Sequence, residues 1–277
     1  MMSAQIAFIG GGNMAASLIG GLIQAGHDPK RIAVAEPNAA RRDWLRAQFG
    51  VDVADHASAV LDHAQVVVPA VKPQQMHDVL SGLTLPSGCV LVSIAAGIEL
   101  ATLRRWLGDA DIYLVRTMPN TPALLGAGIA GLYADDTVPA AARDLASYVL
   151  GAAGTCVWLD NEAQIEAVTA VSGSGPAYFF LVTEAMREVG EKLGLRADIA
   201  STLAVQTFIG AAKMAEDGLA KQIDVAQLRA NVTSKGGTTE AALRHLESAG
   251  LRAIFNDAMH AAATRSRELG ASLAKET

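Results

Sequence analysis

The sequence has little cysteine and no dense run of positive charge. Its 277 residues include two cysteines, Cys89 and Cys156, which lie far apart without a CxxC spacing. We therefore expect small core residues rather than a disulfide framework. The net charge is −6 and lysine and arginine are scattered, which argues against a nucleic-acid or anionic-membrane partner, because both need a positive field. The six histidines lack the spacing of metal ligands, and we expect no metal.

Long apolar runs and a secretory signal are also missing. No uninterrupted apolar run reaches the about 18 residues of a membrane span. The opening residues, MMSAQIAFIGGG, place no basic stretch ahead of an apolar one, as a signal peptide would. Hydrophobic residues nevertheless make up 51% of the chain and charged residues 18%, which is enough for a packed core. We expect a soluble, cytoplasmic protein without a membrane partner.

In the first half of the chain, short β-branched runs alternate with stretches of helical periodicity. Repeated strand–helix units of this length predict right-handed crossovers and a parallel sheet covered on both faces. The pattern predicts strands at residues 5–9, 32–35, 66–68, 90–94 and 112–117, and helices at residues 15–25, 39–49, 74–83 and 101–107.

The β-branched runs disappear from about residue 164 onward, and apolar residues then recur at helical spacing. Helices are predicted at residues 175–193, 199–218, 225–232, 238–249 and 251–269. The change in composition predicts two domains, residues 1–162 and 163–277. The expected fold is therefore α/β followed by all-α, with a doubly wound parallel sheet first and a helical domain second.

A glycine-rich turn stands between the first predicted strand and the first predicted helix. Gly10, Gly12 and Ala15 fit the pattern G-x-G-x-x-G/A. In that pattern the first glycine makes a tight turn, the second admits a pyrophosphate close to the backbone, and the third position allows helix and strand to pack. The helix N-terminus then offers free N–H groups to the phosphates. We interpret the first domain as a Rossmann-like dinucleotide-binding domain.

The residues after the second predicted strand give conflicting signals about which dinucleotide binds. Glu36 stands where an acid would bind the hydroxyls of the adenine ribose and favour NAD. Arg41 and Arg42 follow within a helical turn, and an arginine there would hold the 2′-phosphate of NADP. Glu36 as a solvated strand end is an equally open alternative.

Two further loops follow predicted strands at the edge where open α/β sheets bind ligands. They are residues 70–73 (AVKP) and 94–97 (IAAG). Their small residues and proline suit backbone contact with the nicotinamide ribose. Lys72 would meet a phosphate or carboxylate there, or face solvent.

Three other segments carry glycines and hydroxyls that suit a small anion: residues 118–122 (MPNTP), 172–176 (SGSGP) and 233–239 (TSKGGTT). The second and third each precede a long predicted helix, so each is a candidate anion-binding N-terminus. Helix capping by Ser and Thr is the alternative that needs no ligand. The paired glycines beside the threonine pair favour a site.

Taken together, these segments resemble the pyrroline-5-carboxylate reductase family. The resemblance runs through FIGGGNM, AVKP, MPNTP, AVSGSGPAY, GAAKM and SKGGTT, and so covers nearly the whole chain. The last motif is the most specific, because other reductases share the first. Many members have proline where Lys235 stands, which would alter the stiffness of that loop.

The resemblance implies an oxidoreductase that reduces the C=N bond of 1-pyrroline-5-carboxylate to L-proline with NAD(P)H, in proline biosynthesis. It implies a homodimer or higher oligomer formed by the helical dimerisation domain, and NADPH as the preferred cofactor with NADH possible. Substrate contacts are implied at Asn231, Val232, Gly237, Thr238 and Thr239. Cofactor contacts, with Glu36 added from its place after the second strand, are expected at Ile9, Gly10, Gly11, Gly12, Asn13, Met14, Glu36, Ala70, Val71, Lys72, Pro73, Ile94, Ala95 and Ala96.

The chemistry needs few side chains, because a protonated cyclic imine already accepts hydride well. We expect backbone N–H groups of residues 237–239 to bind the substrate carboxylate. We also expect the Thr239 hydroxyl, directly or through a water, to assist protonation of the ring nitrogen, which makes Thr239 the catalytic candidate.

Two other functions stay open on the residues alone. The β-hydroxyacid dehydrogenases share this architecture and use a lysine of the helical domain, and Lys192 and Lys213 are available. The SKGGTT segment and the absence of that family's lysine-bearing glycine motif argue against them. The other alternative is a protein that senses NADP(H) or carries pyridoxal phosphate without catalysis, since a fold does not prove a function.

Overall fold

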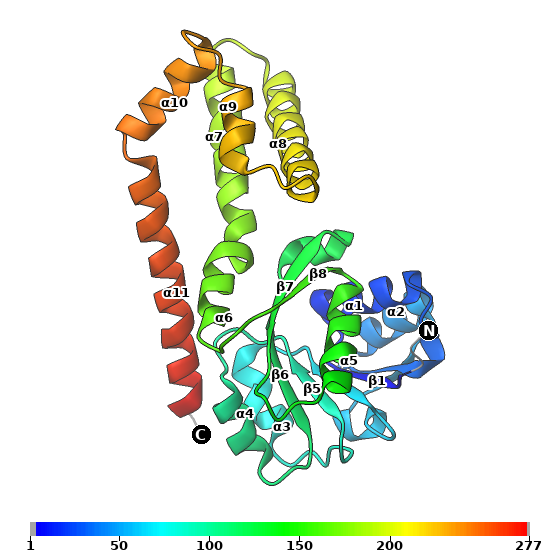
Figure 1. Cartoon of the computed structure of the whole chain (residues 1–277). Helices are drawn as coiled ribbons and strands as arrows, with labels where there is room; N and C mark the ends of the chain where they lie inside the picture. Colours follow the sequence, from blue (N-terminus) through cyan, green and yellow to red (C-terminus); the bar gives the residue numbers. More distant parts are fainter. Residues whose placement is uncertain (1–3, 276–277) are drawn as a thin grey trace. The chain divides into compact units, whose positions relative to one another are not determined.

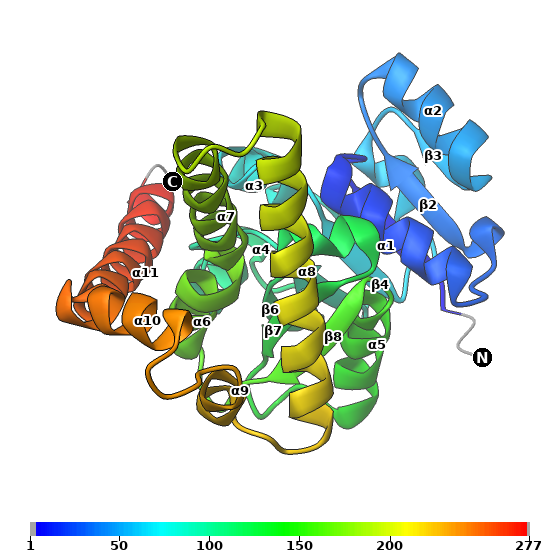
Figure 2. The same ribbon diagram turned by 90° about the horizontal axis from the view of Figure 1, so that it is seen from above.

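The computed structural model describes residues 4–275, and the chain forms two compact units (Figures 1 and 2). Unit 1 comprises residues 1–174 together with residues 261–277, and unit 2 is Gly175–His260. The predicted domain ranges 1–162 and 163–277 extend to residues 1–3 and 276–277, which lie outside the described residues. The division at 162/163 stays a prediction, but the chain after residue 260 contributes to unit 1 rather than to a purely C-terminal body.

Unit 1 is built on one eight-stranded sheet within the described residues, in the order β3-β2-β1-β4-β5-β6-β7-β8. The strands that the sequence predicts all form, with ends shifted by a residue or two. The strands are β1 (Ile6–Ile9), β2 (Ile32–Ala35), β3 (Asp52–Ala54), β4 (Val66–Pro69), β5 (Val90–Ser93), β6 (Tyr113–Met118), β7 (Gly128–Tyr133) and β8 (Gly154–Trp158).

Alternate side chains of the buried strands enter two separate cores, which is why these strands read as continuous apolar runs. Ile6 and Phe8 point into the core shared with α1 (Asn13–Gln24), α2 (Ala39–Phe49) and α5 (Ala140–Gly151). Ala7 and Ile9 point to the opposite face, into the core shared with α3 (Met76–Leu80) and α4 (Leu100–Leu107). The predicted doubly wound arrangement is confirmed, and Figure 1 shows helices on both sides of the sheet.

The sheet is not parallel throughout, which corrects the sequence-based prediction. The six neighbouring strands β3-β2-β1-β4-β5-β6 are all parallel to one another. Strand β6 then pairs antiparallel with β7, and β7 pairs parallel with β8. The short 3₁₀ helix η4 (Thr121–Leu125) turns the chain back after β6. This connection is too short for a crossover to a parallel neighbour, so the chain has to return in the opposite direction.

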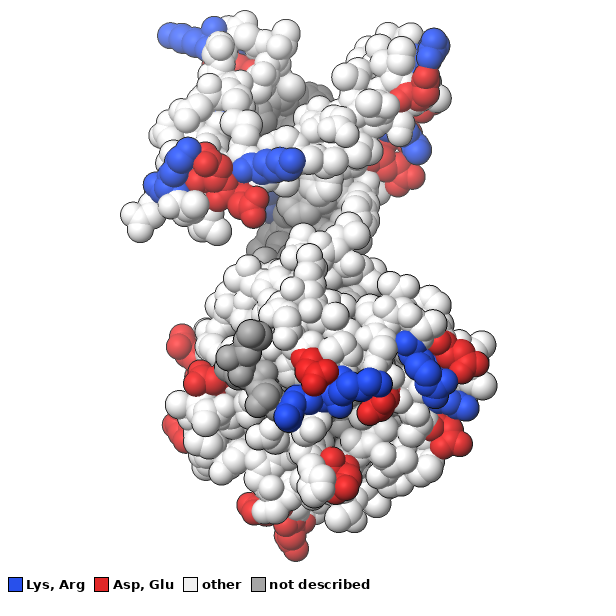
Figure 3. Space-filling view, turned by 90° about the vertical axis from the view of Figure 1, so that its right-hand side faces the viewer, with Lys and Arg blue, Asp and Glu red and all other residues white. Residues whose placement is uncertain are grey.

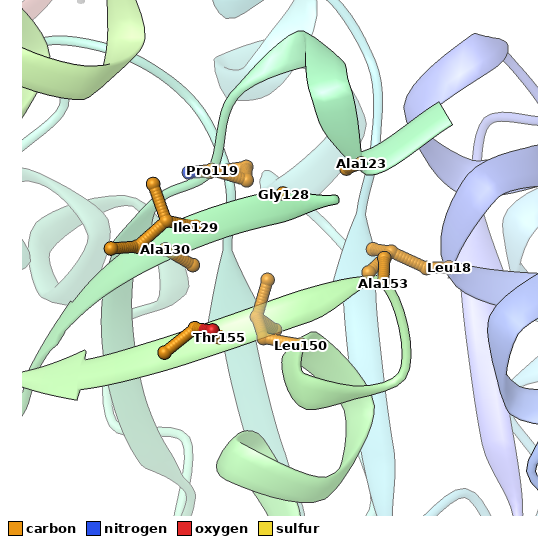
Figure 4. Close-up of a pocket in the computed structure, with 9 residues that line it drawn as sticks. All are labelled: Leu18, Pro119, Ala123, Gly128, Ile129, Ala130, Leu150, Ala153 and Thr155. Carbon is orange, nitrogen blue, oxygen red and sulfur yellow. The ribbon is translucent and has the colours of Figure 1, made fainter. Parts of the chain in front are cut away.

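Strands β7 and β8 approach their neighbours closely through residues without side chains. A Cβ atom on Gly128 would lie 2.8 Å from the Ala153 carbonyl oxygen, and one on Gly154 would overlap the backbone of Gly128. Figure 4 shows the result: Leu18, Ala123 and Ala153 converge on a small apolar hollow beside β7 and β8. Its volume of about 10 Å³ is close to the minimum for a single water. This hollow is packed interior and not a ligand site.

A continuous helical run connects the two units. It consists of α6 (Gln164–Val168), a π-helical turn η5 (Thr169–Gly173) and α7 (Gly175–Lys192). The N–H of Ser174 bonds the Thr169 carbonyl at 2.8 Å, so the backbone around the SGSGP segment is occupied inside the helix. The prediction that this segment forms an anion-binding N-terminus is therefore wrong. The helical run Gln164–Lys192 is also long and apolar enough to cross a membrane, with a mean hydropathy of 1.2. A single helix of this kind is weak evidence for a membrane span, because apolar helices of soluble proteins can reach the same hydropathy.

Unit 2 is helical, as predicted. It contains α7, α8 (Ala197–Ala220), α9 (Val225–Asn231), α10 (Thr238–Ser248) and the first part of α11 (Leu251–Lys275). Helix α7 packs on α8 through stacked Phe179 and Phe208 rings 5.4 Å apart, and on α11 through Tyr178 and Phe255. On the face of the chain drawn in Figure 3, charged side chains lie in small groups, some of both signs and some acidic only, separated by other residues.

Candidate functional site

The three glycines after β1 each have a structural reason. Gly10 has φ +98°, and a Cβ there would lie 2.8 Å from the Ala70 carbonyl oxygen. A Cβ on Gly11 would lie 2.5 Å from Leu45 Cδ1. Gly12 is different: it is the N-cap of α1, and a Cβ there would meet nothing within 4 Å. The first two glycines allow the turn to pack closely against neighbouring residues. The third leaves space for a ligand at the helix start.

The start of α1 is a cradle for an anion. Gly12 provides no side-chain cap, and the first turn of the helix contains no acidic residue. A helix start of this kind offers backbone N–H groups and a partial positive charge. The sequence predicted that the helix begins at residue 15, but α1 already begins at Asn13. The N–H groups of Asn13 and Met14 therefore belong to the free N–H groups of the first helical turn.

Glu36 follows β2 and lies against this turn. Its Oε2 atom accepts a hydrogen bond from the N–H of Gly11 at 3.0 Å, and Oε1 accepts one from the N–H of Asn38 at 2.9 Å. Arg41 donates from Nε to the Gly11 carbonyl at 2.6 Å, and its guanidinium stacks over Trp44 at 4.1 Å. Glu36 and Arg41, which gave opposite indications about the dinucleotide in the sequence, therefore contact the same residue, Gly11.

Arg42 closes the turn after β2 from the other side. Its Nη1 atom donates to the carbonyl oxygens of Glu36 and Pro37 at 2.8 and 2.7 Å. Arg42 is thus committed to the backbone, whereas the Nη2 atom of Arg41 is buried with no hydrogen-bond partner in the described structure. Arg41 therefore has a buried donor that the protein itself leaves without an acceptor.

The loops after β4 and β5 lie on the other side of β1. The strand order runs β2-β1-β4-β5, so the change of direction between β1 and β4 is the position where doubly wound sheets bind ligands. The N–H of Ala70 bonds the Ile9 carbonyl at 2.7 Å, which ties the first loop to the glycine turn. Lys72 is exposed at the start of the 3₁₀ helix η3 (Pro73–Gln75), and Ala95 is buried in the loop after β5.

A buried ion cluster lies behind these loops, and the sequence analysis missed it. Arg116 of β6 is 1% exposed and contacts Glu162 at 3.0 Å and Glu166 at 2.9 Å. Glu162 also accepts a hydrogen bond from the N–H of Leu100, at the start of α4. The signal in the sequence was an arginine inside an otherwise apolar strand, which requires a partner because a lone buried charge is costly.

Two of the three candidate anion segments meet in unit 1. Asn120 of the MPNTP segment is 8% exposed. Its Nδ2 atom donates to the Ser172 carbonyl of the SGSGP segment at 3.1 Å, and its Oδ1 atom accepts from the N–H of Ile129 at 2.9 Å. Asn120 therefore ties the π-helical turn to β7, and both its polar atoms are used in the fold.

The third segment forms the start of α10 in unit 2. Gly237 is the N-cap and has no side chain to cap the helix, and Thr238 and Thr239 occupy the exposed first turn. Gly236 has φ +75°, and its N–H is held by Glu240 Oε2 at 2.7 Å. Like the start of α1, this start has no side-chain cap and offers backbone N–H groups to a small anion, but its first turn also contains the acidic residue Glu240.

The other expected substrate residues precede this turn. Asn231 ends α9 and accepts a hydrogen bond from Gln227 at 2.8 Å, while Val232 is exposed after the helix. All expected substrate residues therefore belong to unit 2, and all expected cofactor residues to unit 1. Each set is gathered locally within its own unit.

The described part of the chain holds no group of three or more His, Cys, Asp or Glu arranged for a metal ion. Cys89 is buried, and burial raises the pKa of its thiol to about 11. Burial also raises the pKa of the Cys156 thiol. Both thiols are protonated at neutral pH and are poor nucleophiles.

The chain closely resembles curated reductases over its whole length. It is 49% identical to the pyrroline-5-carboxylate reductase of Pseudomonas aeruginosa over 275 residues, which cover 99% of each chain. The chain belongs to the pyrroline-5-carboxylate reductase family. The family model described as pyrroline-5-carboxylate reductase dimerisation matches residues 162–269, and the model described as NADP oxidoreductase, coenzyme F420-dependent, matches residues 5–97.

Solved structures of pyrroline-5-carboxylate reductases have the same fold. The enzyme from Coxiella burnetii is 41% identical, with a TM-score of 0.86, and the match covers 97% of this chain and 99% of the other. The pyrroline carboxylate reductase of Plasmodium falciparum, solved with NADP bound, is 26% identical, with a TM-score of 0.80 over 98% of this chain and 99% of the other. As a member of this family, the chain is an NAD(P)H-dependent oxidoreductase.

Proposed function

We propose that this protein reduces the C=N bond of 1-pyrroline-5-carboxylate with NAD(P)H to give L-proline, the last step of proline biosynthesis. The observation that carries the proposal is the full-length match to the P. aeruginosa reductase. The open helix starts at α1 and α10, each with glycine as its N-cap, support it. A cytoplasmic location is part of the same proposal.

The dinucleotide is proposed to lie along the edge formed by the ends of β2, β1, β4 and β5. The cradle at Gly12 fits a pyrophosphate, because any larger residue would place its side chain where the phosphates need to approach. Glu36 and the free Nη2 atom of Arg41 would meet the adenine ribose, and the loops 70–73 and 94–96 the nicotinamide half. When bound, the reduced nicotinamide supplies the hydride.

The start of α10 is proposed to hold the substrate. Its carboxylate would accept hydrogen bonds from the N–H groups of Gly237, Thr238 and Thr239, with Asn231 and Val232 beside it. The hydroxyl of Thr239 would donate to the ring nitrogen or hold the water that protonates it. Lys235, which replaces the proline of many relatives, is exposed next to Gly236 and leaves this geometry intact.

Self-association through unit 2 completes the proposal. Helix α7 exposes Phe180 and Leu181 by 63% and 66% of their surface, and α8 exposes Leu203 and Met214. Apolar side chains gathered in this way mark an interface. They lie within residues 162–269, which the dimerisation model matches. A homodimer or larger assembly of this chain would cover them.

The experiment is the oxidation of NADPH and of NADH by the purified protein, measured side by side with pyrroline-5-carboxylate, piperideine-6-carboxylate and a β-hydroxy acid. We expect consumption of NADPH with pyrroline-5-carboxylate. Turnover of the β-hydroxy acid instead would favour the dehydrogenase alternative, with Lys192 or Lys213 as its lysine. If dinucleotide binds but no substrate is turned over, the chain is a non-catalytic sensor or carrier.

The role of Thr239 is tested by a matched pair of variants. Thr239→Val removes the hydroxyl at nearly constant shape, and Thr239→Ser keeps it. Because a positioned proton donor contributes about a hundredfold or more to rate, kcat/KM should fall at least about tenfold in Thr239→Val and stay near the wild-type value in Thr239→Ser. Equal kcat/KM in both variants and the wild type would remove Thr239 from the mechanism.

A further inference from the structure

The second part of α11 lies in unit 1 and touches the loop after β5 backbone to backbone. Gly97 has φ +81°, and a Cβ on it would lie 2.9 Å from the Gly270 nitrogen and 3.0 Å from the Ser266 carbonyl oxygen. A Cβ on Gly270 would overlap the Gly97 carbonyl oxygen and lie 2.8 Å from the carbonyl carbon. Both positions need glycine, because at each the neighbouring atom is backbone and cannot rotate away.

The end of α11 is fixed in place on both sides of this contact. Leu273 is 8% exposed and packs into the core beneath the sheet, together with α3 and α4. Arg105 of α4 donates from Nη2 to the Ala274 carbonyl at 3.0 Å. A helix end held by both apolar and polar contacts does not shift freely, so the position of the loop at Gly97 depends on where α11 lies.

The loop is held from the sheet side as well. Thr117 of β6 donates from Oγ1 to the Ser93 carbonyl at 3.0 Å, at the end of β5. Ala95 and Ile98 are buried, at 4% and 1% exposure, while Ile94 and Ala96 are partly exposed. The exposed part of the loop is thus clamped between the end of β5 and the last turns of α11.

Strand order assigns this loop to one half of a dinucleotide. The ends of β2 and β1 form the adenine side, with Glu36 and the glycine turn. Strand β5 lies on the far side of β1, beyond β4, so its loop faces the nicotinamide half. A shift of this loop would therefore disturb one half of the ligand and leave the other in place.

We propose that the last turns of α11 position the loop Ile94–Gly97 for the nicotinamide half of the cofactor, with Gly270 as the positioning residue. The inference rests on the proposed function, which makes this loop a cofactor contact. It gives residues 261–275 a role in the dinucleotide site, although by sequence they belong to the helical half of the chain.

The test compares the whole cofactor with its adenine half. Gly270→Ala places a methyl group against Gly97 and forces the loop or the helix end to move. We expect the dissociation constant of NADPH, measured by calorimetry, to rise about tenfold, which is the effect of losing about one hydrogen bond between the displaced loop and the ligand. The dissociation constant of adenosine 2′,5′-bisphosphate, which needs only the adenine side, should not change.

Two further variants complete the design. Gly151→Ala, at the end of α5, is the matched control, because its new Cβ would lie 3.9 Å from the nearest side-chain atom, Cys156 Sγ. It should bind both ligands as the wild type does. Leu273→Ala loosens the helix end by a different route and should also weaken NADPH alone. It keeps the proposal testable should Gly270→Ala fail to fold.

The outcomes separate the inference from the proposed function. If the wild type binds NADPH and Gly270→Ala or Leu273→Ala binds it equally well, the positioning role is overturned and the reductase assignment stands. A parallel loss of NADPH and of the bisphosphate in both variants would also overturn it, because general destabilisation affects both halves. If the wild type binds no NADPH, the proposed function fails together with the inference.

Discussion

At the residue scale, Glu36 has a structural role at the glycine turn and a proposed role in binding the dinucleotide. Its two carboxylate oxygens accept hydrogen bonds from the N–H groups of Gly11 and Asn38. In the proposed function, the same carboxylate lies beside the ribose that presents two hydroxyls in NAD and a 2′-phosphate in NADP. A negative charge there opposes the phosphate, while the free Nη2 atom of Arg41 attracts it. We therefore expect the balance between the two charges to set the preference between NADPH and NADH.

Glu36→Gln removes the charge and keeps an oxygen that accepts from Gly11. We expect the affinity for NADP⁺ relative to NAD⁺ to rise roughly fivefold, because two unit charges about 4 Å apart in water interact by about 1 kcal/mol. Calorimetric titration of both nucleotides measures this ratio.

The control for Glu36→Gln is Asp43→Asn, which makes the same change in charge on α2 at an exposed residue paired with Arg46. Its affinity ratio should stay at the wild-type value. An equal affinity ratio in both variants and the wild type would show that Glu36 does not discriminate between the 2′-hydroxyl and the 2′-phosphate.

The sequence predicted that Glu36 belongs to this site. Its hydrogen bond to Gly11 could not be predicted, because it depends on the close approach of two loops.

At the element scale, the cluster of Arg116, Glu162 and Glu166 attaches α6 and the start of α4 to β6. Because Arg116 is buried, its loss leaves two carboxylates facing each other without a counter-charge. We expect Arg116→Met to lower the free energy of unfolding by about 3 kcal/mol, as is typical when one partner of a buried ion pair is removed.

Urea denaturation followed by tryptophan fluorescence measures this effect, because all three tryptophans, Trp44, Trp106 and Trp158, lie in unit 1. The control is Arg46→Met, which breaks an exposed pair with Asp43 in the same unit and should cost less than about 1 kcal/mol. Similar losses in the two variants would mean that burial adds nothing to the strength of the Arg116 cluster.

Elements were predictable where their periodicity was strong and local. The β-branched runs of the sequence predict strands β1, β2, β4, β5 and β6. The helical spacing of apolar residues predicts the long helices. Half of strand β7, GIAGLY, is glycine or alanine, and its two glycines are needed because Gly131 faces Val168 and Gly128 faces Ala153 at short range. Its strand character comes from neighbours distant in sequence. The direction of β7 and the π-helical turn depend on tertiary contacts in the same way.

At the scale of the whole molecule, unit 2 carries too much exposed apolar surface for a helical body that stays single in water. This surface also explains why Gln164–Lys192 has the hydropathy of a membrane helix. Phe180→Glu should reduce the molar mass measured by light scattering towards that of one chain, 28.7 kDa, because an interface cannot bury an unpaired charge cheaply.

The control for Phe180→Glu is Leu125→Glu. Leu125 is 89% exposed, more than Phe180, but it lies in η4 of unit 1, outside residues 162–269. This variant should keep the wild-type mass. An unchanged mass in Phe180→Glu would mean that α7 is not part of the interface.

The return of α11 to unit 1 also has a consequence for synthesis of the chain. Unit 2 is a single continuous stretch, whereas unit 1 is made of residues 1–174 and residues from 261 onward. Chains emerge from the ribosome N-terminus first, and domains generally fold as units. The glycine turn is therefore made well before Gly270, and the contact between Gly97 and Gly270 can form only after all of unit 2 has been synthesised. In the proposed function, a loop of the dinucleotide site thus reaches its final position later than the glycine turn.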